Sequence, residues 1–475
     1  MRMIERIYID GAFVKPHGTE MFDLFDPARG EVIGQVRLAD ADDARRAIQT
    51  AKRALPSYAR TGKAERLELL RNLHDAVLSR AADLEEATIL EYGAPVTRAR
   101  WTARYAAESF LNAAKTLEAY SFSRPAGGSE VVMEPVGVAG LITPWNANAG
   151  FICNKLAYAL AAGCTAVIKP SEMSALQTEI VTEALHAAGV ARGLFNIVTG
   201  RGEVVGAELT TSPDIAKISF TGSTAVGKAI VKAAADTVKR VTLELGGKSP
   251  SLILEDADLE AAVPMAITAG FQNSGQACLA GTRILVPKAR LSDVLPLAKA
   301  AMAATKVGDL RDPATAIGPM VSARQHDRVQ RYIRLGIEAG ATLVAGGEGH
   351  PDGLGGYFVR PTLFADVTNE MTIAREEIFG PVLCILTYRD EDEAVAIAND
   401  TDYGLASYVF SSDSAHAREI AARLQTGRVV INGAPHDPLA PFGGYKQSGI
   451  GREYGVLGLE AFLEAKAILG GEVMH

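Results

Sequence analysis

The chain has 475 residues, of which 48% are hydrophobic and 22% are charged, and its formal net charge is −8. A length of this size suggests about three domains, and the composition is that of an ordinary globular protein. The negative charge, with no cluster of Lys and Arg, argues against nucleic acid or an anionic membrane surface as a partner.

The sequence contains no apparent membrane span or signal peptide, and its cysteines are few. No stretch reaches the ~18 uninterrupted apolar residues of a membrane span, and the first ten residues lack the apolar core of a signal peptide. We therefore expect a cytoplasmic protein. The four cysteines are widely spaced, which favours reduced thiols over a disulfide framework and indicates no metal site.

The first 136 residues change pattern twice. Residues 7–37 alternate hydrophobic residues with turn signals such as Asp10-Gly11, which predicts short strands joined by tight turns. Residues 39–120 are helical in pattern, with Asp40 and Asp42 as candidate N-caps. Residues 121–136 contain Pro and Gly before an apolar run, which predicts a hairpin outside the main sheet.

Two regions of alternating strand and helix patterns follow. Between residues 137 and 247 the strand candidates are 138–143, 166–169, 195–198, 217–220 and 241–245. This alternation predicts an α/β fold with a doubly wound parallel sheet, whose ligands bind beyond the carboxyl ends of the strands. A Rossmann-like nucleotide domain is the natural interpretation. Residues 251–426 alternate again, with strand candidates at 284–286, 381–386 and 407–410, and predict a second α/β domain.

A candidate phosphate-binding segment, FTGSTAVGK at residues 220–228, runs from a strand into a helix. Backbone N–H groups at such a helix start can face an anion. Gly222 to Lys228 also matches the P-loop pattern GxxxxGK, which would indicate a nucleotide hydrolase. Ala229 lacks the hydroxyl that a P-loop offers to magnesium, and the segment comes late in the sheet order, so we favour a different nucleotide loop.

One acid and one thiol carry the chemistry. Glu244 ends a strand candidate before Gly246-Gly247, where burial would raise the pKa of its carboxyl and suit it to act as a base. Cys278 follows a run of small polar residues that leaves the thiol accessible. A thiolate forms covalent intermediates, and a second group must activate the water that releases the product. Taken alone, each residue is more often structural.

The motifs around these residues resemble the aldehyde dehydrogenase superfamily. LELGGKSP with Glu244 and FQNSGQAC with Cys278 are similar to its two signature motifs, in the same order and at a family-like spacing. Further segments with the same resemblance are PWN at 144–146, IKPSE at 168–172, FTGSTAVGK at 220–228, EEIFGPV at 376–382 and PFGGYKQSG at 441–449. The presence of Glu244 implies the non-acylating, hydrolytic branch.

The resemblance implies a catalytic set. Cys278 would attack the aldehyde carbon, and the Asn146 side chain together with the Cys278 backbone N–H would hold the oxyanion. Glu244 would activate the water that hydrolyses the thioester. Lys155 would help to relay the proton that Glu244 takes.

The resemblance also implies NAD as the cofactor. Glu172 stands where a carboxylate would bond the adenine ribose and repel a 2′-phosphate, so NAD is favoured, with NADP left open. The cofactor-binding residues carried over are Thr143, Trp145, Lys169, Ser171, Glu172, Gly222, Ser223, Leu245, Glu377 and Phe379.

The substrate is less constrained. Asn154 stands where succinate semialdehyde oxidisers tend to place Arg, and without that Arg a carboxylate-bearing substrate loses its charge partner. We therefore predict an uncharged aliphatic or aromatic aldehyde. The alternatives are a semialdehyde dehydrogenase and a catalytically silent NAD-binding or structural homologue. The predicted substrate pocket contains Phe151, Asn154, Leu279, His436 and Phe442.

The expected domain organisation follows from the same resemblance. Residues 1–120 and 138–247 would form the NAD-binding domain, and residues 248–430 the catalytic domain. Residues 121–137 and 455–475 would form an oligomerisation element, so we expect a homodimer or a homotetramer.

Overall fold

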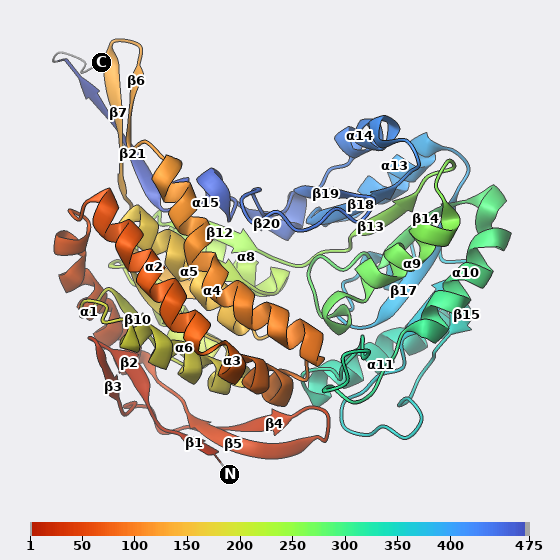
Figure 1. Ribbon diagram of the computed structural model, residues 1–475, viewed down its shortest axis with the longest axis horizontal. Coiled ribbons are helices and arrows are strands. Elements are labelled where there is room, and N and C mark those ends of the chain that lie inside the picture. Colours follow the sequence, from red (N-terminus) through yellow and green to blue (C-terminus); the bar gives the residue numbers. More distant parts are fainter. Residues whose placement is uncertain (1, 471–475) are drawn as a thin grey trace.

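Two open sheets, each covered by helices, make up the body of the molecule, and a narrow arm projects from it (Figure 1). The structure is a computed structural model that describes residues 2–470. Residues 471–475, which end the expected oligomerisation element, lie outside the described residues, as does Met1. No helix within the described part of the chain is both long and apolar enough to cross a bilayer.

The first sheet has eight strands in the order β20-β12-β11-β8-β9-β10-β2-β3. Its five central strands are parallel, which confirms the doubly wound prediction. They are β8 (Val138–Ile142), β9 (Thr165–Lys169), β10 (Phe195–Ile197), β11 (Lys217–Thr221) and β12 (Arg240–Glu244). Antiparallel strands lie at both edges: β2 (Ile7–Ile9) with β3 (Ala12–Val14), and β20 (Gly449–Ile450). The strands in the middle are buried on both faces, which explains their continuous apolar runs.

Helices cover this sheet on both faces. They are α1 (Ala41–Tyr58), α2 (Lys63–Ser79), α3 (Ala81–Ala87), the π-helix η1 (Thr88–Tyr92), α4 (Val96–Ala119), α5 (Asn148–Ala162), α6 (Ala175–Ala187), α7 (Ala207–Thr211) and α8 (Thr224–Ala235). Asp40 caps α1 by accepting the backbone N–H groups of Asp42 and Asp43, whereas Asp42 lies in the first turn and is not the cap. Helix α5 is apolar almost all round because it packs between α4 and the sheet.

The second sheet has seven strands in the order β15-β16-β17-β14-β13-β18-β19. The sequence indicated β14 (Arg283–Pro287), β17 (Val382–Tyr388) and β18 (Ala406–Phe410). It did not indicate β13 (Pro250–Ile253), β15 (Thr342–Ala345), β16 (Thr362–Ala365) or β19 (Arg428–Ile431). The covering helices are α9 (Leu259–Gly270), α10 (Leu291–Ala304), α11 (Ala323–Glu338), α12 (Thr372–Arg375), α13 (Glu391–Asn399) and α14 (Ser414–Arg423).

The arm is a three-stranded antiparallel sheet in the order β21-β7-β6 (Figure 1). The predicted hairpin, β6 (Ser123–Ala126) and β7 (Ser129–Pro135), is confirmed. After the short helix α15 (Gly455–Glu460), the C-terminal strand β21 (Leu463–Leu469) pairs with β7 along its whole length. A further small sheet consists of β1 (Arg2–Ile4), β5 (Glu31–Arg37) and β4 (Met21–Asp26).

Candidate active site

The segment that links the two sheets brings the site residues together. Strand β12 ends at Glu244, and β13 begins at Pro250. Between them the Gly247 N–H donates to Glu377 Oε1 at 3.0 Å. A Cβ on Gly246 would lie 2.6 Å from Glu377 Oε2, and a Cβ on Gly247 would lie 2.4 Å from the Cys278 carbonyl oxygen. The Gly-Gly pair is therefore required for this close approach.

Glu244 is a buried acid without a hydrogen-bond partner. Its residue is 1% exposed, and within residues 2–470 neither carboxylate oxygen has a partner. Burial raises the pKa of this carboxyl well above 4.5, the negative charge of Glu453 raises it further, and Lys155 and Arg452 oppose the shift. An upward shift of the pKa is what the sequence predicted for a carboxyl at the end of a buried strand.

Cys278 lies half-buried on an irregular loop after α9. The single turn η4 (Gln272–Gly275) holds Asn273 and Ser274 at φ values of 54° and 60°, in the left-handed region. Such conformations persist only where the surroundings impose them. Burial raises the pKa of the Cys278 thiol to about 12, with further contributions from Glu377 and Glu244. The thiol is therefore neutral at pH 7, and a base must take its proton before it can attack.

Asn146 lies between β8 and α5 and is tied to the cysteine loop. Its Nδ2 donates to the Gln276 carbonyl oxygen at 3.0 Å, and Asn273 Nδ2 donates to the Asn146 carbonyl oxygen at 2.9 Å. A side-chain amide has two N–H donors, so one remains for another acceptor. The Asn146 side chain is thus bonded to the loop that carries Cys278, two residues before the cysteine.

Lys155 forms a buried ion pair that the sequence did not indicate. Its ammonium contacts the Glu453 carboxylate and donates to Ser219 Oγ at 3.0 Å. Asn154, a predicted pocket residue, is 4% exposed and donates from Nδ2 to Glu453 Oε2 at 3.5 Å. Glu453 comes shortly after the PFGGYKQSG segment, which is the one signal that could have drawn attention to it. Asn154 therefore faces this polar cluster.

The predicted cofactor residues gather at the carboxyl ends of β8, β9 and β11, where a doubly wound sheet binds its ligands. Lys169 Nζ lies 3.1 Å from Glu172 Oε2, and Arg201 Nη1 lies 3.5 Å from Glu172 Oε1. Ser171 caps the single turn η2 (Glu172–Ser174), and Ser223 caps α8. The carboxylate of Glu172 is thus flanked by two cations.

The remaining cofactor residues lie around the same edge. Thr143 follows β8 and is buried, Leu245 packs against Gly227 of α8, and Gly222 donates its N–H to the Glu244 carbonyl oxygen at 3.0 Å. The rings of Trp145 and Phe379 meet edge to face, with centroids 5.5 Å apart.

Two buried polar groups at this edge, on Glu377 and Thr221, could contact a ligand. Glu377 has a raised pKa because it is buried. At the end of β11, Thr221 Oγ1 is buried and has no partner among the described residues.

Two of the predicted substrate residues lie in or against one apolar core cluster, and the ring of His436 lies near two aromatic rings. Phe442 and Tyr454 belong to a core cluster against which Cys278 and Leu279 pack. The His436 ring lies 5.7 Å from that of Tyr105 and 6.1 Å from that of Tyr454. We call Trp101, Tyr105, His436, Phe442 and Tyr454 the aromatic cluster. Phe151 is half-buried on α5.

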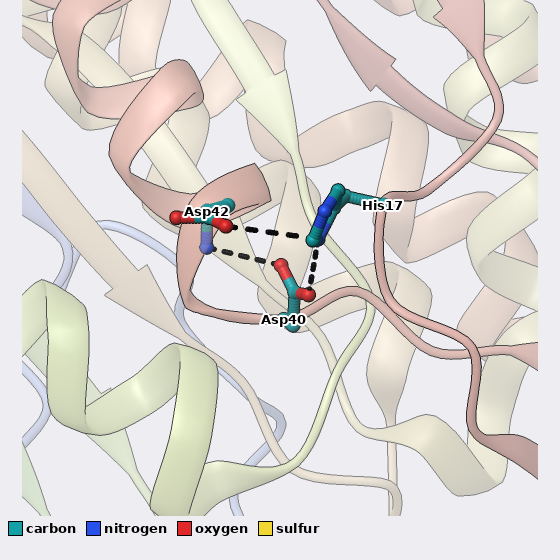
Figure 2. A group of neighbouring side chains, drawn as sticks. All are labelled: His17, Asp40 and Asp42. Atoms are coloured by element: carbon teal, nitrogen blue, oxygen red, sulfur yellow. Dashed lines mark hydrogen bonds and ion pairs between the residues drawn. The ribbon is translucent and has the colours of Figure 1, made fainter.

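One group of potential metal ligands lies outside this site (Figure 2). His17 Nδ1 contacts Asp40 Oδ2 at 2.6 Å, and Asp42 Oδ2 lies 3.7 Å away. Asp40 is the N-cap of α1, and its contact with His17 raises the pKa of that imidazole. Asp40 is thus engaged in capping α1, and His17 and Asp42 lie beside this cap.

Comparison with known proteins identifies the family. The aldehyde dehydrogenase family matches residues 13–468. A 3-succinoylsemialdehyde-pyridine dehydrogenase from a Pseudomonas species is 46% identical over 475 residues, which cover 99% of this chain and all of that protein.

Solved structures agree with this match. A mutant of aldehyde dehydrogenase C from Pseudomonas syringae, in complex with NAD+ and octanal, superposes with a TM-score of 0.96 at 44% identity, over 98% of this chain and 96% of that one. A Mycobacterium tuberculosis aldehyde dehydrogenase in complex with NAD+ gives a TM-score of 0.95 at 40% identity, over 99% and 98% of the two chains.

The chain belongs to the aldehyde dehydrogenase family. It is therefore an enzyme, and the α/β fold predicted from the resemblance is confirmed. Both the P-loop hydrolase and the catalytically silent homologue are set aside. Lys228, which would reach phosphates in a P-loop, is exposed on α8.

Proposed function

We propose that this enzyme oxidises an aldehyde to a carboxylic acid through a covalent intermediate on Cys278, with NAD as the hydride acceptor. The observation that carries the proposal is the buried Glu244 carboxyl, which has no partner in the described chain and influences the thiol of Cys278 electrostatically. The relatives from Pseudomonas syringae and Mycobacterium tuberculosis, both determined with NAD+, support the choice of cofactor.

The cofactor edge fits a dinucleotide. The unpartnered hydroxyl of Thr221 and the start of α8 at Ser223 offer polar groups to a phosphate, and Lys169 with Glu172 offers groups to a ribose. When bound, NAD+ accepts the hydride that leaves the aldehyde carbon. We propose that residues 1–120 and 138–247 bind it and that residues 248–430 carry the cysteine. Arg201 and Lys169 flank Glu172, and their positive charges could bind the 2′-phosphate that this carboxylate alone would repel. NADP is therefore a second candidate.

The first chemical step belongs to Cys278 and Asn146. After the thiol gives its proton to solvent water, sulfur forms a bond to the aldehyde carbon, and the carbonyl electron pair moves to oxygen. The free N–H of Asn146 Nδ2 and the backbone N–H of Cys278 donate to this oxyanion. When the carbonyl re-forms, hydride leaves the carbon and a thioester remains on Cys278.

The second step belongs to Glu244. Its carboxylate takes a proton from water, the hydroxide attacks the thioester carbon, and the C–S bond breaks to release the acid and the thiolate. A pKa raised by burial suits a base that works near neutral pH. We propose that the ion pair of Lys155 with Glu453, together with Ser219, relays the proton from Glu244.

Substrate choice follows from the side chains beyond the cysteine. The prediction of an uncharged aldehyde rested on Asn154, yet this residue is buried and bonded to Glu453. Octanal is named with one relative and a 3-succinoylsemialdehyde-pyridine with another, and neither compound carries a carboxylate. The charges around the aromatic cluster favour the semialdehyde alternative, which is argued below.

We also propose that the arm sheet joins copies of the chain into a homodimer or homotetramer. The exposed side chains of Ile468 and Leu469 on β21 support this role. Light scattering of the full chain tests it, with Leu469→Lys expected to weaken the assembly and a monomeric wild type contradicting it.

The test of the mechanism is NADH formation with a panel of aldehydes. Cys278→Ala should abolish NADH formation. Glu244→Gln should give a burst of one NADH per site and then stop, because the thioester forms but is not hydrolysed. Steady turnover by Glu244→Gln equal to that of the wild type would contradict the proposal.

A further inference from the structure

Two arginines without a carboxylate partner flank the aromatic cluster. Arg98 lies on the first turn of α4, and Arg428 begins β19. In residues 2–470 neither forms an ion pair with Asp or Glu, although most other arginines near the surface do. Both side chains are half-buried. The sequence did not indicate either residue.

Arg428 is held in place by the cluster itself. Its Nη1 donates to His436 Nδ1 at 3.0 Å, and its Nη2 lies 3.4 Å from the Asp437 carbonyl oxygen. The guanidinium carbon lies 5.4 Å from the centre of the Phe442 ring. The residue after Phe442 approaches the buried acid, since a Cβ on Gly443 would lie 2.7 Å from Glu244 Oε1, so Arg428 lies close to the segment that borders Glu244.

Arg98 lies on the opposite border. Its guanidinium carbon stacks 4.4 Å from the centre of the Trp101 ring, and its Nε is buried without a partner among the described residues. Burial raises the pKa of Tyr92, and the positive charge of Arg98 opposes that rise; the Tyr92 hydroxyl accepts from Gln276 Nε2 at 3.3 Å. Arg98 therefore lies between the aromatic cluster and the loop that carries Cys278.

Both arginines act on His436. Burial lowers the pKa of this imidazole to about 4, and the charges of Arg428 and Arg98 lower it further. Asp437 opposes this shift, and its effect on His436 is larger than that of Arg98. At pH 7 His436 is neutral, and the two arginines outnumber Asp437 among the charges that act on it.

Resting on the proposed function, we infer that the substrate is an aldehyde whose far end carries a carboxylate, which Arg98 and Arg428 recognise across the aromatic cluster. Guanidinium groups match carboxylates in geometry and charge. The rings between them and Cys278 suit an apolar spacer. An uncharged aldehyde would leave two half-buried cations without a counter-charge.

The experiment compares aldehydes of equal length that end in a carboxylate, in its methyl ester, in a methyl group or in a pyridine ring. The wild type should prefer the carboxylate over the ester by about 10- to 100-fold in kcat/KM, the size expected for charge-assisted hydrogen bonds. Arg98→Met and Arg428→Met should each remove most of this preference, chiefly through KM, and should lower kcat/KM for the carboxylate far more than for the methyl-ended aldehyde.

Matched controls separate recognition from stability. Arg104→Met changes an exposed arginine on the same helix as Arg98 and should leave the preference intact. Arg428→Lys keeps the positive charge and should therefore keep part of the preference for the carboxylate over the ester. Equal kcat/KM of the wild type for the carboxylate, the ester and the pyridine, or an equal loss for all aldehydes in both Met variants, would overturn the inference. NADH from none of the aldehydes, despite NAD binding, would overturn the proposed function instead.

Discussion

Two buried glutamates show how similar burial supports opposite roles. Glu91 on the π-helix η1 is 2% exposed, and its carboxylate accepts the backbone N–H groups of Leu176 and Gln177, each at 2.8 Å, at the start of α6. Glu244 is 1% exposed and has no partner in the described chain. Burial raises the pKa of both carboxyls, that of Glu91 to about 8.

The difference lies in the partners. The carboxyl of Glu91 completes the first turn of α6, and removing it strands two backbone donors. The carboxyl of Glu244 completes nothing in the protein, so it destabilises the fold when charged and is free to act on a water molecule. The number of hydrogen bonds, rather than the depth of burial, distinguishes Glu91 from the acid that we propose as the base.

The largest expected effect is a loss of turnover without a loss of stability when Glu244 is replaced. Glu244→Gln should lower steady-state turnover by about 10³-fold, the usual contribution of a general base. The melting temperature should not fall, because the variant removes a buried charge that has no partner. Steady-state kinetics and thermal unfolding of the same preparation check both outcomes, and a drop of several degrees would show that Glu244 has a structural partner.

Glu453 is an intermediate case, a buried glutamate paired with a cation. Lys155→Met should cost about 3 kcal/mol of unfolding free energy, because it leaves the Glu453 carboxylate buried and unpaired. The double variant Lys155→Met/Glu453→Gln should recover most of that loss but not the rate of thioester hydrolysis. Denaturant unfolding and pre-steady-state NADH traces measure the two quantities. If the double variant recovers the rate of thioester hydrolysis, the proposal that Lys155 and Glu453 relay a proton from Glu244 is wrong.

Glu91 should behave in the opposite way to Glu244. Glu91→Ala should lose about 2 kcal/mol of unfolding free energy, since two buried N–H groups lose their acceptor. Turnover per folded molecule should be unchanged. Glu91→Gln, which keeps one acceptor oxygen, is the matched control and should lose less. If Glu91→Ala alters the pH profile of turnover, its role is not structural alone.

The smallest expected effect is the change with pH of the unfolding free energy that Glu244 contributes. The pKa of Glu244 is raised above its ordinary 4.5, so the folded state keeps a proton that the unfolded state has lost. The unfolding free energy of the wild type, minus that of Glu244→Gln, should therefore fall as pH rises above 4.5, by at most about 1.4 kcal/mol per pH unit. The fall should end at the folded pKa. A difference that rises with pH would mean a lowered pKa.

The sequence predicted what depends on local pattern. Alternating strand and helix patterns gave the parallel core of the first sheet, and Glu244, Cys278 and Asn146 were found from strand ends and family-like motifs. Contacts between distant segments could not be predicted. Lys155 and Glu453 are 298 positions apart, and Arg98 and Arg428 come from different elements. Four-residue strands such as β13 and β16 were missed, because so short a run becomes a strand only through its neighbours in the sheet.

Glu453 and β20 come after Lys155, Glu244 and Cys278 in the sequence, although Glu453 lies beside Lys155 and β20 beside Glu244 in the fold. Synthesis proceeds from the N-terminus, so Lys155, Glu244 and Cys278 all exist before their last neighbours are made. Until β20 is available the edge of β12 stays open, and an open edge invites pairing with other chains. The same late segment supplies the counter-charge of Lys155 and the third strand of the arm. Synthesis of residues 449–453 thus supplies the counter-charge of Lys155 and closes the edge of β12 at nearly the same moment.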